Sequence, residues 1–210
     1  GDVTAIDMIS PSGKVYRCPF EGLTLDRRSF DKSLVKLAVE RGARLETQTS
    51  LLSIKDGVAK TTMGEIKAKV IVGADGPRSR TAREAGMRGV SESYPAVTCQ
   101  ADGSFESVVK MYFGSVAPGG YAWIIPKRKG ANVGIGFNNR ALKQRPSELF
   151  QRFVDNLEIE YHDMTMGLVP TSGPVPHTVS GNVLLVGDAA GMVMATNGGG
   201  IPTAMIAGRF

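Results

Sequence analysis

The sequence has few of the residues that build metal sites and disulfide scaffolds. It contains two cysteines, Cys18 and Cys99, and two histidines among 210 residues. Neither cysteine has a second cysteine or a histidine at the spacing of metal ligands, and one widely separated pair does not make a disulfide scaffold. We therefore predict no metal site. We expect both cysteines to be small, buried apolar residues in a protein of the reducing cytoplasm.

Recognisable targeting, membrane-spanning and nucleic-acid-binding segments are also lacking. No apolar stretch follows a charged opening, so no signal peptide is visible. Residues 189–208 carry no charge, but Asn197, three consecutive glycines and Pro202 interrupt them, which predicts a loop that enters a buried helix rather than a membrane span. The net charge of +5 is spread along the chain without a zinc-finger or RNA-binding signature, so we expect no nucleic-acid partner.

Glycine is abundant, with 26 residues, and hydrophobic residues make up 42%, which is enough for a packed core. The apolar periodicity predicts helix–strand units in residues 21–88 and 182–210 with a strand-rich block between them, which is an α/β fold with an inserted β domain. The expected elements are a hairpin of residues 3–9 and 14–18, helices at 29–41, 79–86 and 147–157 and from 202, strands at 43–49, 66–73, 94–101, 105–114, 121–126, 131–138 and 182–186, and a hairpin turn at 56–57.

Two of these helices are predicted in more detail. In the first, Phe30, Leu34, Leu37 and Ala38 fall on one side, which predicts an apolar face. In the third, Ser147 is placed as the N-cap residue, because a serine hydroxyl accepts a hydrogen bond from the first turn of a helix.

Two turns share one pattern, in which an apolar strand is followed by small residues and an aspartate beside a glycine. The first contains Asp75 and Gly76, and the second contains Gly187 and Asp188. Open α/β sheets bind ligands at the carboxyl ends of their parallel strands, where a carboxylate can accept hydrogen bonds from sugar hydroxyls. Aspartate and glycine are also common in ordinary turns, so either turn alone is equally well explained as a simple connection.

A run of three glycines, Gly198–Gly200, favours the ligand-binding interpretation of the second turn. It precedes Ile201 and Pro202 and lies only ten residues after Asp188. Consecutive glycines at a helix entrance expose backbone N–H groups beside the positive end of the helix. We expect such a nest to hold a phosphate or a flavin carbonyl.

Four segments carry a resemblance to a known family: residues 25–31 (LDRRSFD), 73–86 (GADG to AG), 118–126 (PGGYAWIIP) and 187–201 (GDAAG to NGGGI). In this order they resemble the flavin-dependent geranylgeranyl reductases of archaeal lipid synthesis, which are similar to digeranylgeranylglycerophospholipid reductase and form a branch of the p-hydroxybenzoate-hydroxylase-like flavoproteins. The segment with Tyr121 and Trp123 is the most specific. The chain departs from the family pattern at Ile125, where phenylalanine is usual, and at Ala195, where proline is frequent.

The resemblance implies an FAD-binding, Rossmann-like three-layer domain, incomplete in this chain, with an inserted antiparallel β-sheet substrate domain. Residues 21–88 and 182–210 would belong to the FAD-binding domain, and residues 1–20 and 89–181 to the substrate domain. The cofactor-binding residues that it implies are Arg27, Leu51, Asp75, Gly76, Gly187, Asp188, Gly199, Gly200 and Ile201. The substrate-binding residues that it implies are Tyr121, Trp123 and Pro126, lining an apolar tunnel for an isoprenoid chain.

In this family the cofactor carries the chemistry, because reduced FAD supplies the hydride. The aromatic segment contains no obvious general acid, so we predict no catalytic residue. Tyr121 and Trp123 lie two residues apart on a predicted strand and therefore point to one face. Flat aromatic walls suit a polyprenyl tail, although two core aromatics would show the same spacing. The electron donor stays open between NADPH, ferredoxin and another reduced carrier.

The dinucleotide-binding fingerprint Gly-x-Gly-x-x-Gly is absent, and the nearest glycine pair, Gly134 and Gly136, lies in a predicted strand. We therefore expect an internal portion of a longer enzyme. Expected partners are an isoprenoid lipid, an electron-donor protein and, through basic segments such as residues 127–129, the membrane surface. Two alternatives stay open: a flavin-dependent monooxygenase or halogenase of the same fold, and a non-catalytic fragment or binding module.

Overall fold

The computed structural model describes residues 1–142 and 144–210. It divides into two compact units: a first unit of Gly1–Arg44 and Pro95–Gly167, and a second unit of Leu45–Tyr94 and Leu168–Phe210. The divisions fall at different residues from the predicted domain boundaries, and the first helix is grouped with the first unit. The assignment of one part to cofactor and the other to substrate stays a prediction.

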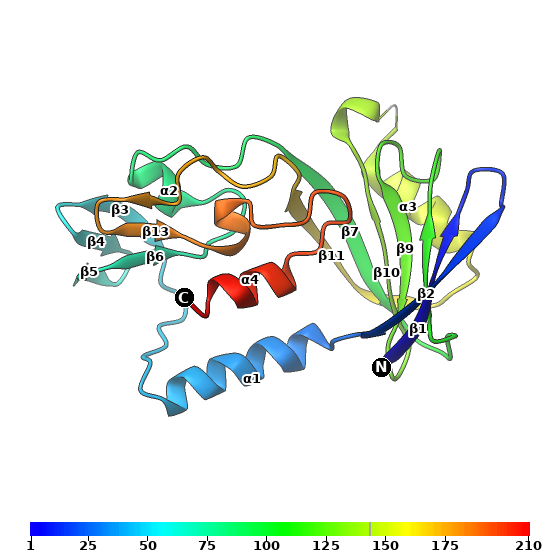
Figure 1. Cartoon of the computed structure of the whole chain (residues 1–210), viewed down its shortest axis with the longest axis horizontal. Helices are drawn as coiled ribbons and strands as arrows, with labels where there is room; N and C mark the ends of the chain where they lie inside the picture. The colour runs from blue at the N-terminus through cyan, green and yellow to red at the C-terminus, as the bar shows by residue number, and fades with distance from the viewer. Residues whose placement is uncertain (143) are drawn as a thin grey trace. The chain divides into compact units, whose positions relative to one another are not determined.

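A seven-stranded sheet makes up most of the first unit (Figure 1). Its order is β11-β7-β10-β9-β8-β1-β2. β1 runs parallel to β8, whereas β1–β2, β8–β9, β9–β10 and β7–β10 are antiparallel. The antiparallel sheet predicted for the middle of the chain is thereby confirmed, and so is the first hairpin. The strands are β1 (Asp2–Ile9), β2 (Val15–Leu23), β7 (Ser93–Ala101), β8 (Val108–Tyr112), β9 (Tyr121–Pro126), β10 (Ala131–Gly136) and β11 (Tyr161–Pro170).

Helix α3 (Pro146–Asp155) covers one face of this sheet, and together they form the main hydrophobic core. Leu149, Phe150, Phe153 and Val154 of the helix are buried against alternate residues of β7, β9 and β10. The predicted cap at Ser147 is wrong. The helix begins one residue earlier, at Pro146, because proline suits the first helical position and Arg145 takes the N-cap place.

Helix α1 (Arg27–Glu40) also belongs to the first unit. The carboxylate of Asp26 caps it by accepting hydrogen bonds from the backbone N–H groups of Arg28 and Ser29. All of its residues are described and none of them is buried, so its predicted apolar face is present but half exposed, with Leu34 and Leu37 each 44% accessible. Residues 43–49, also all described, form no strand. Gln48 adopts a φ of 56°, which interrupts an extended chain.

The second unit contains two three-stranded sheets. In one of them, β3 (Leu51–Lys55), β4 (Val58–Thr61) and β5 (Gly64–Lys67) form an antiparallel meander with the predicted turn at residues 56–57. In the other, β12 (Val179–Ser180) pairs antiparallel with β13 (Val183–Leu185), which pairs parallel with β6 (Ile71–Gly73). The single strand predicted at 66–73 is therefore two strands, since β5 and β6 pair in different sheets.

Short helical segments complete the described chain: α2 (Arg80–Glu84), α4 (Ile201–Ala207), and 3₁₀ turns η1 (Asn139–Ala141) and η2 (Gly187–Ala190). Within the residues described, no helix is both long enough and apolar enough to cross a membrane. Cys99 is buried as predicted, and burial raises the pKa of its thiol to about 11. The prediction for Cys18 is wrong, because it lies exposed on the edge strand β2.

Candidate functional site

The two glycine–aspartate turns follow neighbouring parallel strands of the second unit. β6 and β13 pair in register, with Gly73 opposite Leu185, and the backbone N–H of Val186 donates to the carbonyl of Gly73 at 3.0 Å. Both turns therefore leave the same edge of one sheet, which is the edge where ligands bind in open α/β sheets. The apolar runs before each aspartate predicted the two strands, and the structure adds that they pair with each other.

Asp75 uses both carboxylate oxygens to fix the start of α2. One oxygen accepts from the hydroxyl of Ser79 at 2.6 Å, and the other accepts from the backbone N–H and the hydroxyl of Thr81 at 2.9 and 3.0 Å. Burial of Asp75 by itself raises its pKa, but these hydrogen bonds together outweigh burial and the pKa is lowered overall. The carboxylate of the first turn is thus committed to the framework.

Gly73, at the end of β6, allows α2 to pack closely against the sheet. A Cβ atom at this position would lie 2.7 Å from Cβ of Thr81 and 2.8 Å from Cδ2 of Leu185. Such distances are too short for carbon atoms, so a side chain at residue 73 would push the helix away. Together with Asp75, this glycine makes the first turn a compact structural joint.

Asp188 is placed differently, beside the glycine-rich loop. A Cβ atom on Gly200 would lie 3.2 Å from Oδ1 of Asp188, so the carboxylate is adjacent to a backbone that carries no side chain. The hydroxyl of Thr203 in α4 donates to the carbonyls of Gly200, at 2.9 Å, and Met192. These bonds join the loop, α4 and the segment after η2. The structure therefore brings together Asp188 and Gly200, as predicted from their spacing.

The glycine-rich loop is not the open nest of N–H groups that its sequence predicts. The N–H of Gly198 donates to the carbonyl of Met194 at 2.8 Å, and the N–H of Gly199 donates to Oδ1 of Asn197 at 2.9 Å. These two donors are consumed within the loop, because it closes on itself through the bridge between Met194 and Gly199. The loop instead places the backbone of Gly200, which carries no side chain, next to the carboxylate of Asp188.

An apolar cavity of about 390 Å³ lies between this loop region and α4, lined by Pro174, Met192, Val193, Met194, Thr203, Ile206 and Ala207. Ile201, the predicted flavin contact after the glycines, is half-buried as the first residue of α4. Leu51, the predicted adenine contact, is half-buried at the start of β3 in the same unit.

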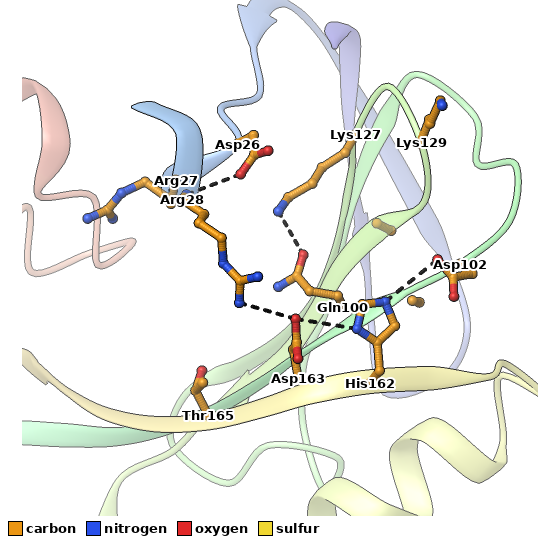
Figure 2. Close-up of a pocket in the computed structure, with 12 residues that line it drawn as sticks. Asp26, Arg27, Arg28, Gln100, Asp102, Lys127, Lys129, His162, Asp163 and Thr165 are labelled. Carbon is orange, nitrogen blue, oxygen red and sulfur yellow. Dashed lines mark hydrogen bonds and ion pairs between the residues drawn. The ribbon is translucent and has the colours of Figure 1, made fainter. Parts of the chain in front are cut away.

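Arg27 belongs to the first unit, where it lines a charged cavity of about 410 Å³. Its guanidinium pairs with Asp31, one turn along α1, at 2.9 Å. Figure 2 shows the side chain of Arg27 directed away from the other cationic side chains of the cavity. Among these, Arg28 lies 3.3 Å from a carboxylate oxygen of Asp163, and Lys127 donates to an amide oxygen. The cationic side chains of this cavity are therefore mostly matched by polar or acidic partners. The contact between Arg27 and a cofactor stays a prediction.

His162 and Lys127 complete the interactions of this cavity. The imidazole of His162 lies between the carboxylates of Asp102, at 3.6 Å, and Asp163, at 3.4 Å. Nζ of Lys127 donates to the side-chain oxygen of Gln100 at 2.7 Å (Figure 2). Among the residues described, no group of three histidine, cysteine or acidic side chains is arranged to hold a metal ion.

The predicted substrate residues separate onto the two faces of the seven-stranded sheet. Ala122, Ile124 and Pro126 of β9 are buried, the first two in the core with α3, whereas Tyr121 and Trp123 point to the opposite face. We call this second surface the aromatic face. Pro126 does not share it, because it is three residues from Trp123 on a strand in which directions alternate.

The aromatic face carries a row of rings. The ring centroids of Phe113 and Tyr121 are 6.1 Å apart, and those of Tyr121 and Trp123 are 5.7 Å apart. Burial raises the pKa of the Tyr121 hydroxyl. Met111 is the cross-strand partner of Trp123 and extends the apolar surface toward β1. Phe113 and Met111 were not predicted, and only the strand register could have identified them.

Comparisons with known proteins identify relatives of this chain. The family described as geranylgeranyl reductase catalytic domain matches residues 91–169. A digeranylgeranylglycerophospholipid reductase of Methanocaldococcus jannaschii is 34% identical, over 96% of this chain and 57% of its own length. Its counterpart in Methanosarcina acetivorans is 37% identical, over 90% of this chain and 52% of its own length. The chain thus spans little more than half the length of these relatives.

Solved structures show the same fold. A crystal structure of a geranylgeranyl bacteriochlorophyll reductase-like protein from Thermoplasma acidophilum has a TM-score of 0.86 at 26% identity, covering 98% of this chain and 59% of that one. A flavin-dependent brominase has a TM-score of 0.76 at 18% identity, covering 98% of this chain and 60% of its own. The predicted α/β flavoprotein fold is confirmed, and the brominase likeness concerns the fold alone.

Proposed function

The chain belongs to the geranylgeranyl reductase family, and from this premise we propose that it serves an FAD-dependent reduction of carbon–carbon double bonds in isoprenoid lipid chains. The observation that carries the proposal is the aromatic face, a row of rings within the segment that matches the family's catalytic domain. The relatives named above are lipid reductases by name, and the substrate class is taken from them.

The residues of the second turn fit a flavin. Asp188 and Gly200 place a carboxylate beside bare backbone, which suits a large planar ligand with hydroxyl groups on its tail. In this proposal Asp188 lies by the ribityl and phosphate region and accepts hydrogen bonds from the ribityl hydroxyls, and residues 199–201 contact the ring by their backbone. Gly187 lets the turn adopt a φ of 59°, while Asp75 and Gly76 support the site from the neighbouring strand. Arg27 and Leu51 remain proposed contacts with the rest of the cofactor. Reduced FAD supplies a hydride to the double bond when it is bound.

The aromatic face supplies orientation and exclusion of water. A polyprenyl chain has no polar group to hold, so flat side chains that bury it provide its binding free energy. The rings of Tyr121 and Trp123 lie side by side, with their centroids 5.7 Å apart, and present two adjacent aromatic surfaces. Basic residues of the turn after β9, Lys127–Lys129, are proposed to approach anionic headgroups at a membrane surface. We propose a reduced carrier, such as NADPH or ferredoxin, as the electron source.

The test uses full-length protein, a geranylgeranyl glycerolipid and FAD reduced by dithionite without oxygen. We expect the product to gain the mass of two hydrogen atoms for each double bond reduced. Trp123→Ala should keep the flavin content of the unsubstituted protein and lower turnover of the C20 lipid about 10-fold, because a large apolar contact is lost. Tyr16→Ala, an exposed aromatic on the edge strand β2, is the matched control and should leave turnover unchanged.

Three results would contradict the proposal. An unchanged lipid mass, with a hydroxylated or halogenated small aromatic product once oxygen and halide are supplied, would support the monooxygenase or halogenase alternative. Equal turnover of long and short prenyl substrates by Trp123→Ala would remove the aromatic face from the substrate site. A full-length protein that never takes up FAD would favour a non-catalytic binding module.

A further inference from the structure

The aromatic face carries a chain of hydrogen bonds that ends on the indole of Trp123. Nε1 of Trp123 donates to Oδ1 of Asn132 at 2.8 Å. Nδ2 of Asn132 donates to the hydroxyl of Thr98 at 2.6 Å and to the carbonyl of Cys99 at 3.1 Å. The hydroxyl of Thr98 donates onward to the carbonyl of Val133 at 3.1 Å. An indole N–H can only donate and a backbone carbonyl can only accept, so the amide of Asn132 has one orientation that satisfies both.

Gly134 supports the same ring from the neighbouring strand. It is the cross-strand partner of Trp123, and a Cβ atom on it would lie 2.5 Å from Cε2 of the indole and closer still to Cζ2. The ring therefore occupies the space that a side chain at residue 134 would need. At Gly136, two residues along the same strand, an added Cβ would lie 3.7 Å from Cζ3, an ordinary contact. The indole thus packs against the backbone of Gly134, and its nitrogen is hydrogen-bonded to Asn132.

These contacts determine which surface the indole presents. A tryptophan that is only half-buried on a sheet can adopt several side-chain rotamers, and each would offer a ligand a different outline. The bond to Asn132 selects the rotamer in which the ring lies across β10, in line with the rings of Tyr121 and Phe113. A binding surface that is ordered before the ligand arrives loses less entropy on binding.

We propose that Asn132 is a positioning residue for isoprenoid binding, which holds the indole of Trp123 over Gly134 so that one ring face lies against the prenyl chain. The inference rests on the proposed function, because it assigns the ligand of the aromatic face to that reaction. Asn132 acts through Trp123 and needs no contact with the substrate. The effect should increase with prenyl chain length, because a longer chain covers more of the ring row.

The single tryptophan of the chain reports on this position directly. Asn132→Leu keeps the size of the side chain and removes both its acceptor and its donor. We expect a lower anisotropy of Trp123 emission and an affinity for geranylgeraniol in detergent micelles about 5-fold weaker, with a smaller loss for farnesol. Gln100→Leu is the matched control. Gln100 is the cross-strand partner of Asn132 but bonds to Lys127, so this variant should stay within about twofold of the unsubstituted protein.

A second pair of variants separates positioning from a general effect on folding. Trp123→Phe retains an aromatic ring but lacks the N–H, so adding Asn132→Leu to it should change the affinity measured by calorimetry less than about twofold. An equal loss in both backgrounds would overturn the positioning role. If Asn132→Leu does not fold, Asn132→Asp is the second variant. It keeps the acceptor for the indole but places a carboxylate against the carbonyl of Cys99. It should therefore lower the Trp123 anisotropy and the geranylgeraniol affinity in the same direction, but by less than Asn132→Leu.

Two failures can be told apart. Unchanged anisotropy and affinity in Asn132→Leu, with geranylgeraniol bound by the unsubstituted protein, would overturn this inference alone. If the unsubstituted protein binds neither geranylgeraniol nor farnesol, the proposed function is overturned and the inference with it.

Discussion

The two glycine–aspartate turns start from one sequence pattern and have different surroundings. Asp75 engages Ser79 and Thr81 with both oxygens at the start of α2, whereas Oδ1 of Asp188 faces the bare backbone of Gly200. The first carboxylate is part of the framework, and the second lies where a ligand can reach side-chain-free backbone. One strand–aspartate pattern therefore occurs in two different surroundings, and only the second has a glycine-rich segment packed against the carboxylate.

The largest expected difference between the turns is in stability. Asp75→Ala removes the acceptor of three hydrogen bonds and leaves the buried Ser79 and Thr81 without it, so the free energy of unfolding in urea should fall by about 3 kcal/mol. Asp155→Ala is the control. It removes an exposed carboxylate at the end of α3 and should cost about 0.5 kcal/mol or less. Equal losses in the two variants would mean that the first turn is not a structural joint.

A second difference is expected in cofactor affinity. Asp188→Asn keeps the shape of the side chain and removes its charge, so the affinity of full-length protein for FAD, followed by flavin fluorescence, should fall about 10-fold. Asp75→Asn should change it less than about twofold, because that carboxylate is turned into the framework. A comparable loss in both variants would contradict the separate roles of the turns.

The smallest expected difference is in the response to acid. The folded-state pKa of Asp75 is lowered, so its ionisation stabilises the fold fully above its ordinary pKa of about 3.9. This stabilisation is lost as the pH falls through the lower, folded-state value. The unfolding free energy of the unsubstituted protein should therefore drop more steeply below about pH 4 than that of Asp75→Asn. Parallel curves would show that the hydrogen bonds to Asp75 do not favour its charged form.

The local pattern of apolar and turn residues was sufficient to predict elements whose structure depends on residues nearby in the sequence. The hairpin turn at Asp56 and the strands of the antiparallel sheet follow from apolar runs and turn residues. The strand predicted at 43–49 failed because Gln48 takes a left-handed conformation. The cap predicted at Ser147 failed because Pro146 begins the helix before it.

The candidate site was predictable only in part, because its finer features depend on which strands lie side by side. Asp188 and Gly200 are close in sequence, and their spacing indicated that they meet. The roles of Asn132 and Gly134 follow instead from their register against Trp123, which no local pattern contains. The loop after Met194 appeared open from its glycines alone, but hydrogen bonds to Gly198 and Gly199 close it.

The most direct test of the account is the visible absorbance of reduced flavin in full-length protein, followed without oxygen after a geranylgeranyl glycerolipid is added. The account predicts that the bleached flavin bands return on addition of the lipid, and that they return more slowly in Trp123→Ala. Flavin that stays bleached with the lipid, and regains its colour only when oxygen is admitted, would contradict the account.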